Sequence, residues 1–154
     1  MISIVETKDY KIISKLNEEV QNLHARLHPE VFKAYNNEAI ELEFKNFLSD
    51  PNCKCFLAKN DESAIGYIFC FIRAINENAF HYSFKTIYID QLTVLEKYRR
   101  SGVGKLLLEQ VEHLAKEHSI EKIELDHWSS NDVAARYFRK NGYQLYKERL
   151  FKLI

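Results

Sequence analysis

The stretch YIDQLTVLEKYRRSGVGK, residues 88–105, joins a strand-like run to a basic, glycine-containing turn that opens directly into a helix. The N-terminus of a helix carries roughly half a positive charge, so a cation there is unfavourable by a few tenths of a kcal/mol. Arg99, Arg100 and Lys105 nevertheless crowd this end, and no acidic residue lies between them. Such crowding indicates a bound anion, and backbone N–H groups at a helix start bind phosphate well. The stretch therefore predicts a pyrophosphate site.

Around this stretch, size and composition predict one ordinary globular domain, residues 1–154, with an apolar content of 46%. The 22 basic and 22 acidic residues cancel, so no overall positive field favours nucleic acid. No apolar run approaches the roughly 20 residues that a membrane span needs. The first residues lack the layout of a secretory signal, so a cytoplasmic location is the default expectation.

Three cysteines, Cys53, Cys55 and Cys70, have no companion pair and no histidine at ligand spacing. A C-x-C inside an apolar strand is more typical of buried thiols than of a metal site. A disulfide framework is also not expected for a chain of this size and location. We therefore predict no metal ion and three reduced, buried cysteines.

Apolar spacing outlines the remaining elements. Spacings of three and four residues predict helices at 9–28, around 40–48, after the basic turn from Leu106 to Ala115, and at 131–141. Strand-like runs lie at 2–5, 53–59, 64–74, 80–95, 123–125, 143–146 and 150–154. The resulting order, βααβββαβαββ, indicates a mixed α/β fold.

Two familiar phosphate motifs do not fit the turn. The pattern G-x-G-x-x-G fails because Leu107 occupies its third glycine position. The P-loop pattern fails because Leu106 follows Gly104-Lys105 where Ser or Thr is needed. The alternative without function is that Arg99 and Arg100 lie in a solvated turn of a helical hairpin.

Two motifs together resemble those of the GNAT superfamily of N-acetyltransferases. The first is Arg99-x-x-Gly102-x-Gly104 after a strand, similar to that family's loop for the pyrophosphate of acyl-coenzyme A. The second is the run NDVAARYFRKNGY, residues 131–143, similar to its later N-x-x-A…G-[FY] helix. The resemblance implies the GNAT fold, a mixed central sheet flanked by about four helices.

The resemblance also assigns residues to acetyl-CoA, the implied cosubstrate. Gly102 and Gly104 would let the backbone approach the pyrophosphate closely, and Arg99 and Arg100 would add charge. Backbone N–H groups of the loop would bind the phosphate oxygens. The pantetheine arm would pair with the preceding strand, and an asparagine would steady that arm. The loop donors are Ser101, Gly102, Val103, Gly104 and Lys105; the strand residues are Leu92, Thr93 and Val94; the asparagine is Asn131, which could equally serve only as a helix cap.

Asp90 is our candidate for the general base. It lies inside an otherwise apolar strand, where an unpaired carboxylate is costly to bury. Strand alternation predicts that Asp90 shares one face with Leu92 and Val94. Its place also resembles that of the acidic residue in polyamine and thialysine acetyltransferases, and the chain's end, RLFKL, is similar to theirs. A purely structural role for Asp90, holding a backbone group or a basic side chain, stays open.

The general acid departs from the family pattern. Members of the family usually have a tyrosine seven residues after the helix-opening asparagine, and counting from Asn131 this position is Phe138. Tyr137 is adjacent but about 100° around a helix, so it would face elsewhere unless the helix starts one residue off. Tyr137 remains the candidate acid, with water or the product ammonium as substitutes.

We thus predict transfer of an acetyl group from acetyl-CoA to a primary amine, by direct attack on the thioester. The acceptor would be a small molecule. The alternatives are a protein or peptide amine, or a coenzyme A-binding module without catalysis. His127 is a reserve base, and His24, His28, Glu38 and Glu41 lie where the family builds its acceptor site. A homodimer is expected only by analogy with similar proteins.

Overall fold

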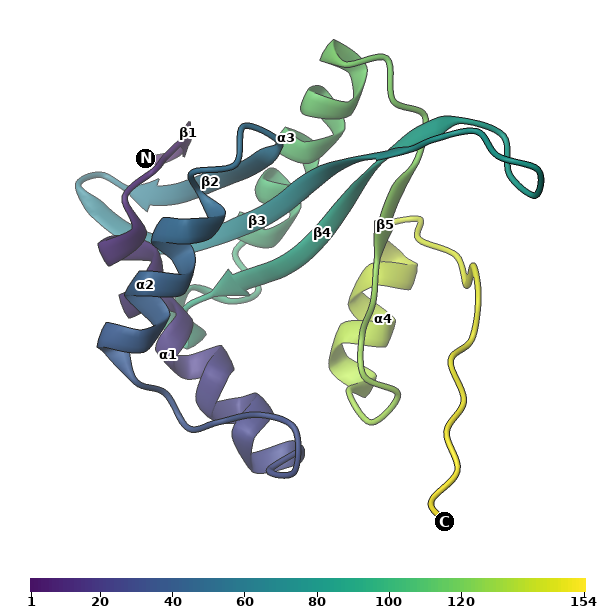
Figure 1. Ribbon diagram of the computed structural model, residues 1–154. Coiled ribbons are helices and arrows are strands. Elements are labelled where there is room, and N and C mark those ends of the chain that lie inside the picture. Colours follow the sequence, from purple (N-terminus) through teal and green to yellow (C-terminus); the bar gives the residue numbers. More distant parts are fainter.

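The computed structural model describes the chain from Met1 to Ile154. Its strands form a mixed five-stranded sheet in the order β1-β2-β3-β4-β5, with helices on both faces (Figure 1). The first four strands pair antiparallel, and β5 pairs parallel to β4. In chain order the elements are β1 (Ile2–Glu6), α1 (Tyr10–Leu27), α2 (Asn37–Phe47), β2 (Cys53–Asn60), β3 (Ser63–Ile75), β4 (Phe84–Val94), the short 3-10 helix η1 (Glu96–Tyr98), α3 (Val103–Glu117), β5 (Ile123–Leu125) and α4 (Asp132–Lys140).

Two apolar clusters cover the two faces of the sheet. Helices α1 and α2 bury Ile13, Leu16, Phe44 and Leu48 against one face. Helix α3 buries its apolar stripe against the other face, and Tyr137 and Phe138 of α4 pack at the margin of the same cluster. Because β2 and β3 are covered on both sides, they are nearly continuous in apolar residues. The α3 stripe consists of Val103, Leu107, Leu108, Val111, Leu114 and Ala115.

Strand β4 contains a β-bulge. Gln91 lies opposite Phe69 and Ile89 lies opposite Cys70, so Asp90 is the extra residue in the ladder. As a result Ile89 and Leu92, three residues apart, both pack against the α3 cluster. The bulge thus reverses the alternation of side chains halfway along the strand.

Three of the four α-helices begin with a side-chain cap. Asp9, Asn36 and Asn131 each accept backbone N–H bonds at the start of α1, α2 and α4. The N-cap residue of α3 is Gly102, which has no side chain to cap the helix. Its first N–H groups therefore lack the partner that the other helices have.

The predicted elements agree with the structure except at the C-terminus. The strands predicted at 143–146 and 150–154 are wrong, since no residue after α4 belongs to a strand. In Figure 1 this segment runs past α4 and away from the sheet. The strand predicted at 80–95 is shorter and begins at Phe84. No helix is long and apolar enough to cross a membrane.

The cysteines are buried thiols, as predicted. Burial raises the pKa of Cys53 and of Cys70 to about 12, so both stay protonated at neutral pH. These thiols are packing groups of the sheet.

Candidate active site

The basic turn between β4 and α3 has an unusual backbone. Arg100 and Gly102 both adopt left-handed conformations, with φ of 64° and 86°. The Ser101 hydroxyl closes the turn by donating to the Tyr98 carbonyl over 2.5 Å. Left-handed residues in a turn expose successive N–H groups on one side and create concavities that bind anions.

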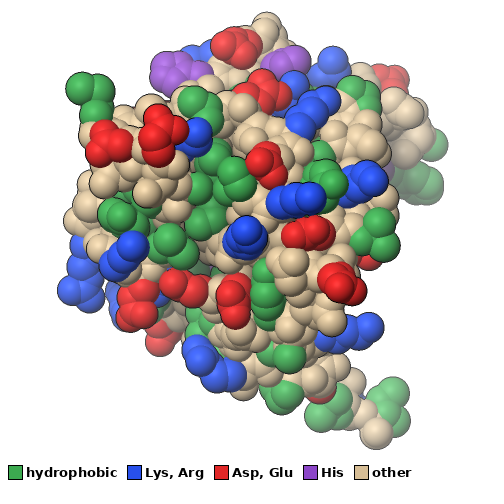
Figure 2. Space-filling view, turned by 90° about the vertical axis from the view of Figure 1, so that its left-hand side faces the viewer, with side chains coloured by type: hydrophobic (Ala, Val, Ile, Leu, Met, Phe, Trp, Pro, Cys, Tyr) green, Lys and Arg blue, Asp and Glu red, His purple; other side chains and the backbone are tan.

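The start of α3 combines this turn with an uncapped helix end. Its first turn has no acidic residue, and Arg100 and Lys105 are exposed beside it. Lys105 has only an exposed ion pair, 3.5 Å from Glu109 one turn further along. Elsewhere acidic and basic side chains alternate over the surface, as Figure 2 shows for one face. The positive charge at this helix end is therefore local, and it suits an anion.

Arg99 was expected to add positive charge for the phosphate, but its guanidinium is already bound within the protein. Its Nε donates to the Val94 carbonyl over 2.9 Å, and its Nη2 lies 3.3 Å from Oε2 of Glu19 on α1. The same Glu19 oxygen accepts the N–H of Glu96 over 3.2 Å. Arg99 thus ties the end of β4 and the turn to α1.

The edge of β4 that precedes the turn is open. Strand β5 pairs only with Ile87–Ile89, while β4 continues to Val94. The predicted residues Leu92, Thr93 and Val94 therefore have a free edge toward β5, where an extended ligand could pair. Thr93 is buried, and Leu92 and Val94 pack against the α3 cluster.

Helix α4 brings a tyrosine to the start of α3. A Cβ built on Gly104 would lie 2.6 Å from the hydroxyl of Tyr137, so only glycine leaves room for this phenol. The hydroxyl is buried without a hydrogen-bond partner. Phe138 instead packs against Tyr143, with ring centroids 5.6 Å apart. The expectation that Tyr137 faces elsewhere is therefore wrong, although α4 starts where it was predicted.

Asn131 caps α4 as the sequence allows. Its Oδ1 accepts the N–H of Ala134 over 3.0 Å. The cap uses only the oxygen of this amide, so the Nδ2 donors remain for a ligand.

Asp90 lies on the face opposite to the predicted one. The bulge separates it from Leu92 and Val94 and leaves it on the side of Tyr88. The guanidinium of Arg73 lies 3.6 Å from the centre of the Tyr88 ring, and the Tyr88 hydroxyl donates to Asp126 over 3.0 Å. Asp90 is exposed at the surface and not buried as the apolar strand suggested. Desolvation by the surrounding protein nevertheless raises its pKa above that of an ordinary carboxyl, against the opposing effects of Gln91 and Arg73.

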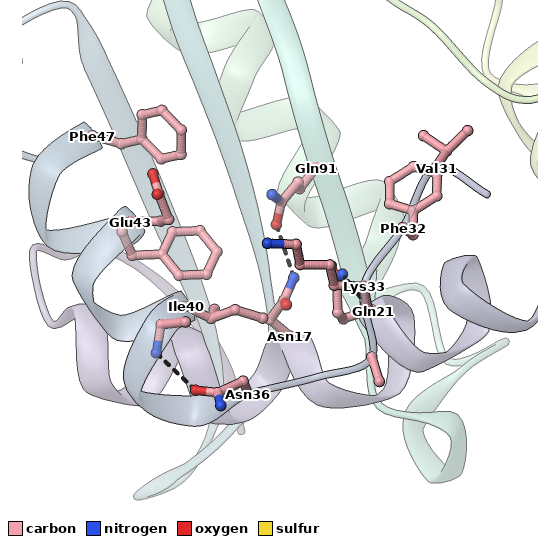
Figure 3. A pocket seen from close by; sticks show the side chains of 13 residues that line it. Asn17, Gln21, Val31, Phe32, Lys33, Asn36, Ile40, Glu43, Phe47 and Gln91 are labelled. Carbon is pink, nitrogen blue, oxygen red and sulfur yellow. Dashed lines mark hydrogen bonds between the residues drawn. The ribbon is translucent and has the colours of Figure 1, made fainter. Parts of the chain in front are cut away.

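Next to the bulge, a cavity of about 430 Å³ lies between α1, α2, their connecting loop and β4 (Figure 3). At its floor, Asn17 donates to the Tyr67 hydroxyl over 3.0 Å and to Gln91 over 3.2 Å. The Tyr67 hydroxyl in turn donates to Gln91 over 2.5 Å. The loop wall is held by Gln21, whose amide donates to the Lys33 carbonyl over 2.7 Å.

The cavity walls are largely apolar, with one acid and one base. Phe32 and Lys33 come from the loop, and Ile40, Glu43 and Phe47 come from α2. Three residues of this cavity, Asn17, Glu43 and Gln91, were not predicted from the sequence. The two on helices carried a signal: Asn17 follows Ile13 by four residues and Glu43 precedes Phe47 by four, so each polar residue lies on an apolar helix face.

The predicted histidines lie beside this cavity rather than in it. His28 stacks on Trp128 with ring centroids 4.0 Å apart, and its Nε2 lies 3.1 Å from the Ser130 hydroxyl. This contact bridges the end of α1 and the loop after β5. His24 packs on Phe32, and His127 is exposed. Glu38 and Glu41 of α2 do not line the cavity, and Glu41 accepts from Asn37 over 2.9 Å.

A helix end suited to phosphate, an open strand edge before it and a cavity on the other side of that strand define a class of α/β acyl-coenzyme A-dependent transferases. The model of the acetyltransferase (GNAT) family matches residues 17–143, and the chain belongs to this family. The predicted family and fold are therefore confirmed, and the family supports an acetyltransferase that uses acetyl-CoA.

Solved structures share this fold. A tetramutant of the BH1408 protein from Bacillus halodurans has a TM-score of 0.90 at 21% identity, covering 100% of this chain and 99% of that one. The aminoglycoside N-acetyltransferase AAC(6')-Iy in complex with CoA has a TM-score of 0.74 at 18% identity, covering 100% and 95%. The aminoglycoside acetyltransferase meta-AAC0020 from an uncultured soil metagenomic sample, in complex with sisomicin, has a TM-score of 0.69 at 16% identity, covering 99% and 96%.

Proposed function

We propose that residues 1–154 act as one catalytic domain that transfers an acetyl group from acetyl-CoA to a primary amine of a small molecule. The observation that carries this proposal is the uncapped start of α3. This helix start follows strand β4, which has a bulge at Asp90 and an open edge toward β5. The phosphate-type site lies at the end of β4, and a cavity large enough for a small amine lies next to the bulge. The cavity favours a small acceptor over a protein, because it is concave and walled by side chains.

Acetyl-CoA would be bound by backbone N–H groups and side chains that have no hydrogen-bond partner within the protein. The N–H groups of Val103, Gly104 and Lys105 would donate to the pyrophosphate, with Arg100 and Lys105 adding charge. The pantetheine arm would pair with the open edge at Leu92–Val94, and Asn131 would steady it through Nδ2. Arg99 acts as a positioning residue for the turn, since its guanidinium already contacts Glu19 and Val94.

The acceptor would enter the cavity beside Gln91. Its apolar and aromatic walls suit a carbon body, while Glu43 offers a charge to a second amine. This arrangement supports an amine with an apolar body and at most one further amino group.

The main chemical requirement is to remove a proton from the acceptor. An alkyl ammonium with a pKa of about 10.4 is deprotonated only about once in 2,500 at pH 7, which costs about 4–5 kcal/mol. Asp90, next to the cavity residue Gln91, would take this proton. Its raised pKa makes it a better base than an ordinary carboxylate.

Acetyl-CoA supplies a thioester whose carbonyl carbon accepts the amine. The new C–N bond forms, the C–S bond breaks, and the leaving thiolate needs one proton. Tyr137 would hold a proton for this purpose, because burial raises the pKa of its phenol and keeps it protonated.

Measuring thiol release from acetyl-CoA with a panel of amines tests the proposal. The panel contains polyamines, an aminoglycoside, amino acid derivatives and a lysine peptide. We expect turnover with at least one small amine. Turnover only with the peptide would favour protein acetylation, and tight acetyl-CoA binding without turnover would favour a non-catalytic module.

Asp90→Asn tests the base. We expect kcat to fall about 100-fold, and the acid limb of the kcat/KM profile to disappear. The control is Asp126→Asn, which changes the neighbouring carboxylate bonded to Tyr88 and should cost less than tenfold. If Asp126→Asn gives the larger loss, the base is Asp126 and the assignment of Asp90 is wrong.

A further inference from the structure

One lysine of the chain lies at the cavity proposed for the acceptor amine. Lys33, in the loop between α1 and α2, lines this cavity, and no other lysine does. Figure 3 shows its side chain extending from the loop into the cavity, toward the side where Asn17 and Gln91 lie. A lysine side chain ends in a primary amine, which is the group that the proposed reaction acetylates. The protein thus has an amine of its own at the proposed acceptor site.

Hydrogen bonds hold the backbone on both sides of this lysine. The amide of Gln21 on α1 donates to the Lys33 carbonyl over 2.7 Å, and Oδ1 of Asn22 accepts the N–H of Tyr35 over 3.1 Å. The Tyr35 hydroxyl donates to Oδ1 of Asn37 in α2 over 2.7 Å. The loop is therefore tied to both helices, and the base of the Lys33 side chain stays at the cavity wall.

The ammonium of Lys33 has no partner within the protein. None of the ion pairs includes it, and only Lys54 and Lys122 donate hydrogen bonds through Nζ. Glu43, the other charged residue of the cavity, is on α2, whereas Lys33 comes from the loop. An unpaired lysine keeps its rotamer freedom, so its amine can reach a reactive group bound in the cavity.

The proposed acetyl-CoA site brings its thioester toward this amine. The pyrophosphate would bind at the start of α3, and the pantetheine arm would run back along β4 from Val94 to Leu92. The sulfur end of the arm then lies toward the bulge, where Asp90 and Gln91 follow one another. Because Gln91 and Lys33 line the same cavity, the acetyl group, the proposed base and the lysine amine meet there.

We propose that Lys33 is a self-acetylation site, whose amine takes the acetyl group from acetyl-CoA bound to the same chain. This inference rests on the proposed acetyl transfer and uses its groups. The Lys33 nitrogen bonds to the thioester carbonyl carbon, the C–S bond breaks, and coenzyme A leaves as a thiolate. The nitrogen loses two protons in all: one passes through Asp90 to water, and the other balances the proton that Tyr137 gives to the thiolate.

Self-acetylation changes the cavity as well as the lysine. A group on a short flexible tether acts at an effective concentration on the order of mM, so Lys33 competes with free amines below that concentration. The amide product is no longer a nucleophile, and each chain therefore reacts once at this site. Acetylation removes the positive charge and leaves Glu43 as the only charged side chain of the cavity. The modified chain should therefore favour acceptors with a second cationic group.

Mass spectrometry of the full chain after incubation with acetyl-CoA, without an added amine, tests the inference. We expect one acetyl group on Lys33 and its loss in Lys33→Arg, because a guanidinium stays protonated. The matched control within the same molecule is Lys45, which is exposed on α2 and does not line the cavity. Lys45 should be labelled at least tenfold more slowly. An unlabelled Lys33, or equal labelling of the two lysines, would overturn the proposal.

The rate of labelling shows whether the reaction occurs within one chain at the proposed site. At saturating acetyl-CoA, the rate constant for Lys33 should not depend on protein concentration, and a rate constant that rises in proportion would mean transfer between chains. Asp90→Asn should slow the labelling of Lys33 about 100-fold and leave that of Lys45 unchanged. Labelling of Lys33 at the full rate in Asp90→Asn would contradict self-acetylation through this site.

The panel of free amines separates a failure of this inference from a failure of the proposed function. An amine that is turned over should slow the labelling of Lys33, because both need the same cavity, and undiminished labelling would contradict self-acetylation. Turnover of a small amine while Lys33 stays unlabelled would sink self-acetylation alone. A labelled Lys33 without turnover of any panel amine would support self-acetylation and refute the small-molecule acceptor.

Discussion

Two buried tyrosine hydroxyls mark the two sides of the site, and they differ in one respect. The Tyr67 hydroxyl, beneath the floor of the proposed acceptor cavity, bonds to Asn17 and Gln91. The Tyr137 hydroxyl, against the start of α3, bonds to nothing in the protein. Burial raises the pKa of both phenols, so both are neutral donors. On the proposed acceptor side the protein supplies the partners of this hydroxyl, and only Asn17 Oδ1 beside it is left without one. On the proposed cofactor side the hydroxyl itself has no partner.

The same contrast separates the backbones of the two sides. The helices that build the acceptor cavity, α1 and α2, begin with side-chain caps, whereas α3 does not. A buried polar group without a partner costs about 1–3 kcal/mol. Polar groups without a hydrogen-bond partner are therefore expected mainly at sites where a ligand supplies that partner.

Tyr67→Phe should give the largest effect on stability. Removing this hydroxyl removes its hydrogen bonds to Asn17 and Gln91 and leaves only the bond between those two side chains, so the free energy of unfolding should fall by about 1–3 kcal/mol. Urea denaturation of the protein without ligand measures it. The matched control is Tyr137→Phe, which removes a hydroxyl that bonds to nothing and should change stability by less than about 0.5 kcal/mol. Equal losses in the two variants would contradict the comparison.

The local structure around the starts of α3 and α4 could be predicted because its signals are local. The helix after the turn, the cap at Asn131 and the glycine at the end of α4 each depend on neighbours within a few residues. The uncapped start of α3 can likewise be inferred from Gly102 and the basic residues around it. The fold could be predicted because two such local motifs, residues 99–104 and 131–143, occur in the order typical of the family.

The acceptor side could not be predicted in the same way, because it depends on contacts between distant residues. Asn17, Tyr67 and Gln91 are separated by 50 and 24 positions. The bulge at Asp90 depends on how β4 is aligned with β3. The alternation of apolar and polar residues along β4 alone does not reveal this alignment. The strands predicted at 143–146 and 150–154 were wrong, because strand propensity alone does not supply a partner strand and these residues belong to no strand of the sheet.

Gly102→Ala should give the next largest effect. A left-handed backbone costs a residue with a Cβ about 1–2 kcal/mol, and any relaxation of the turn would misdirect the N–H groups of α3. We expect this loss of stability together with about tenfold weaker binding of coenzyme A, measured by calorimetry. Gly142→Ala is the matched control, because Gly142 has nearly the same φ of 87° and equal free space around it. It should lose similar stability and keep its affinity. Equal affinity losses would mean that the α3 turn has no special part in binding.

Gly104→Ala tests the contact between α3 and Tyr137. The added Cβ would lie 2.6 Å from the hydroxyl, so the phenol must move, and we expect a loss of about 1 kcal/mol in stability. In the Tyr137→Phe background the same change should be neutral or stabilising, since alanine favours a helix over glycine. A double-mutant cycle by urea denaturation measures a coupling of about 1 kcal/mol. Additive effects would show that the hydroxyl lies elsewhere.

Lys105→Gln should give the smallest effect, because this lysine is exposed and screened by salt. In the first turn of α3 its charge is unfavourable without a ligand and favourable beside a phosphate. We therefore expect stability to be unchanged or slightly higher, and coenzyme A to bind about twofold to fivefold more weakly at low salt. The matched control is Lys116→Gln in the last turn of the same helix, which should leave binding unchanged and cost a few tenths of a kcal/mol in stability. Raising the ionic strength should reduce the difference in affinity, whereas a difference that persists in high salt would mean that Lys105 acts through shape and not through charge.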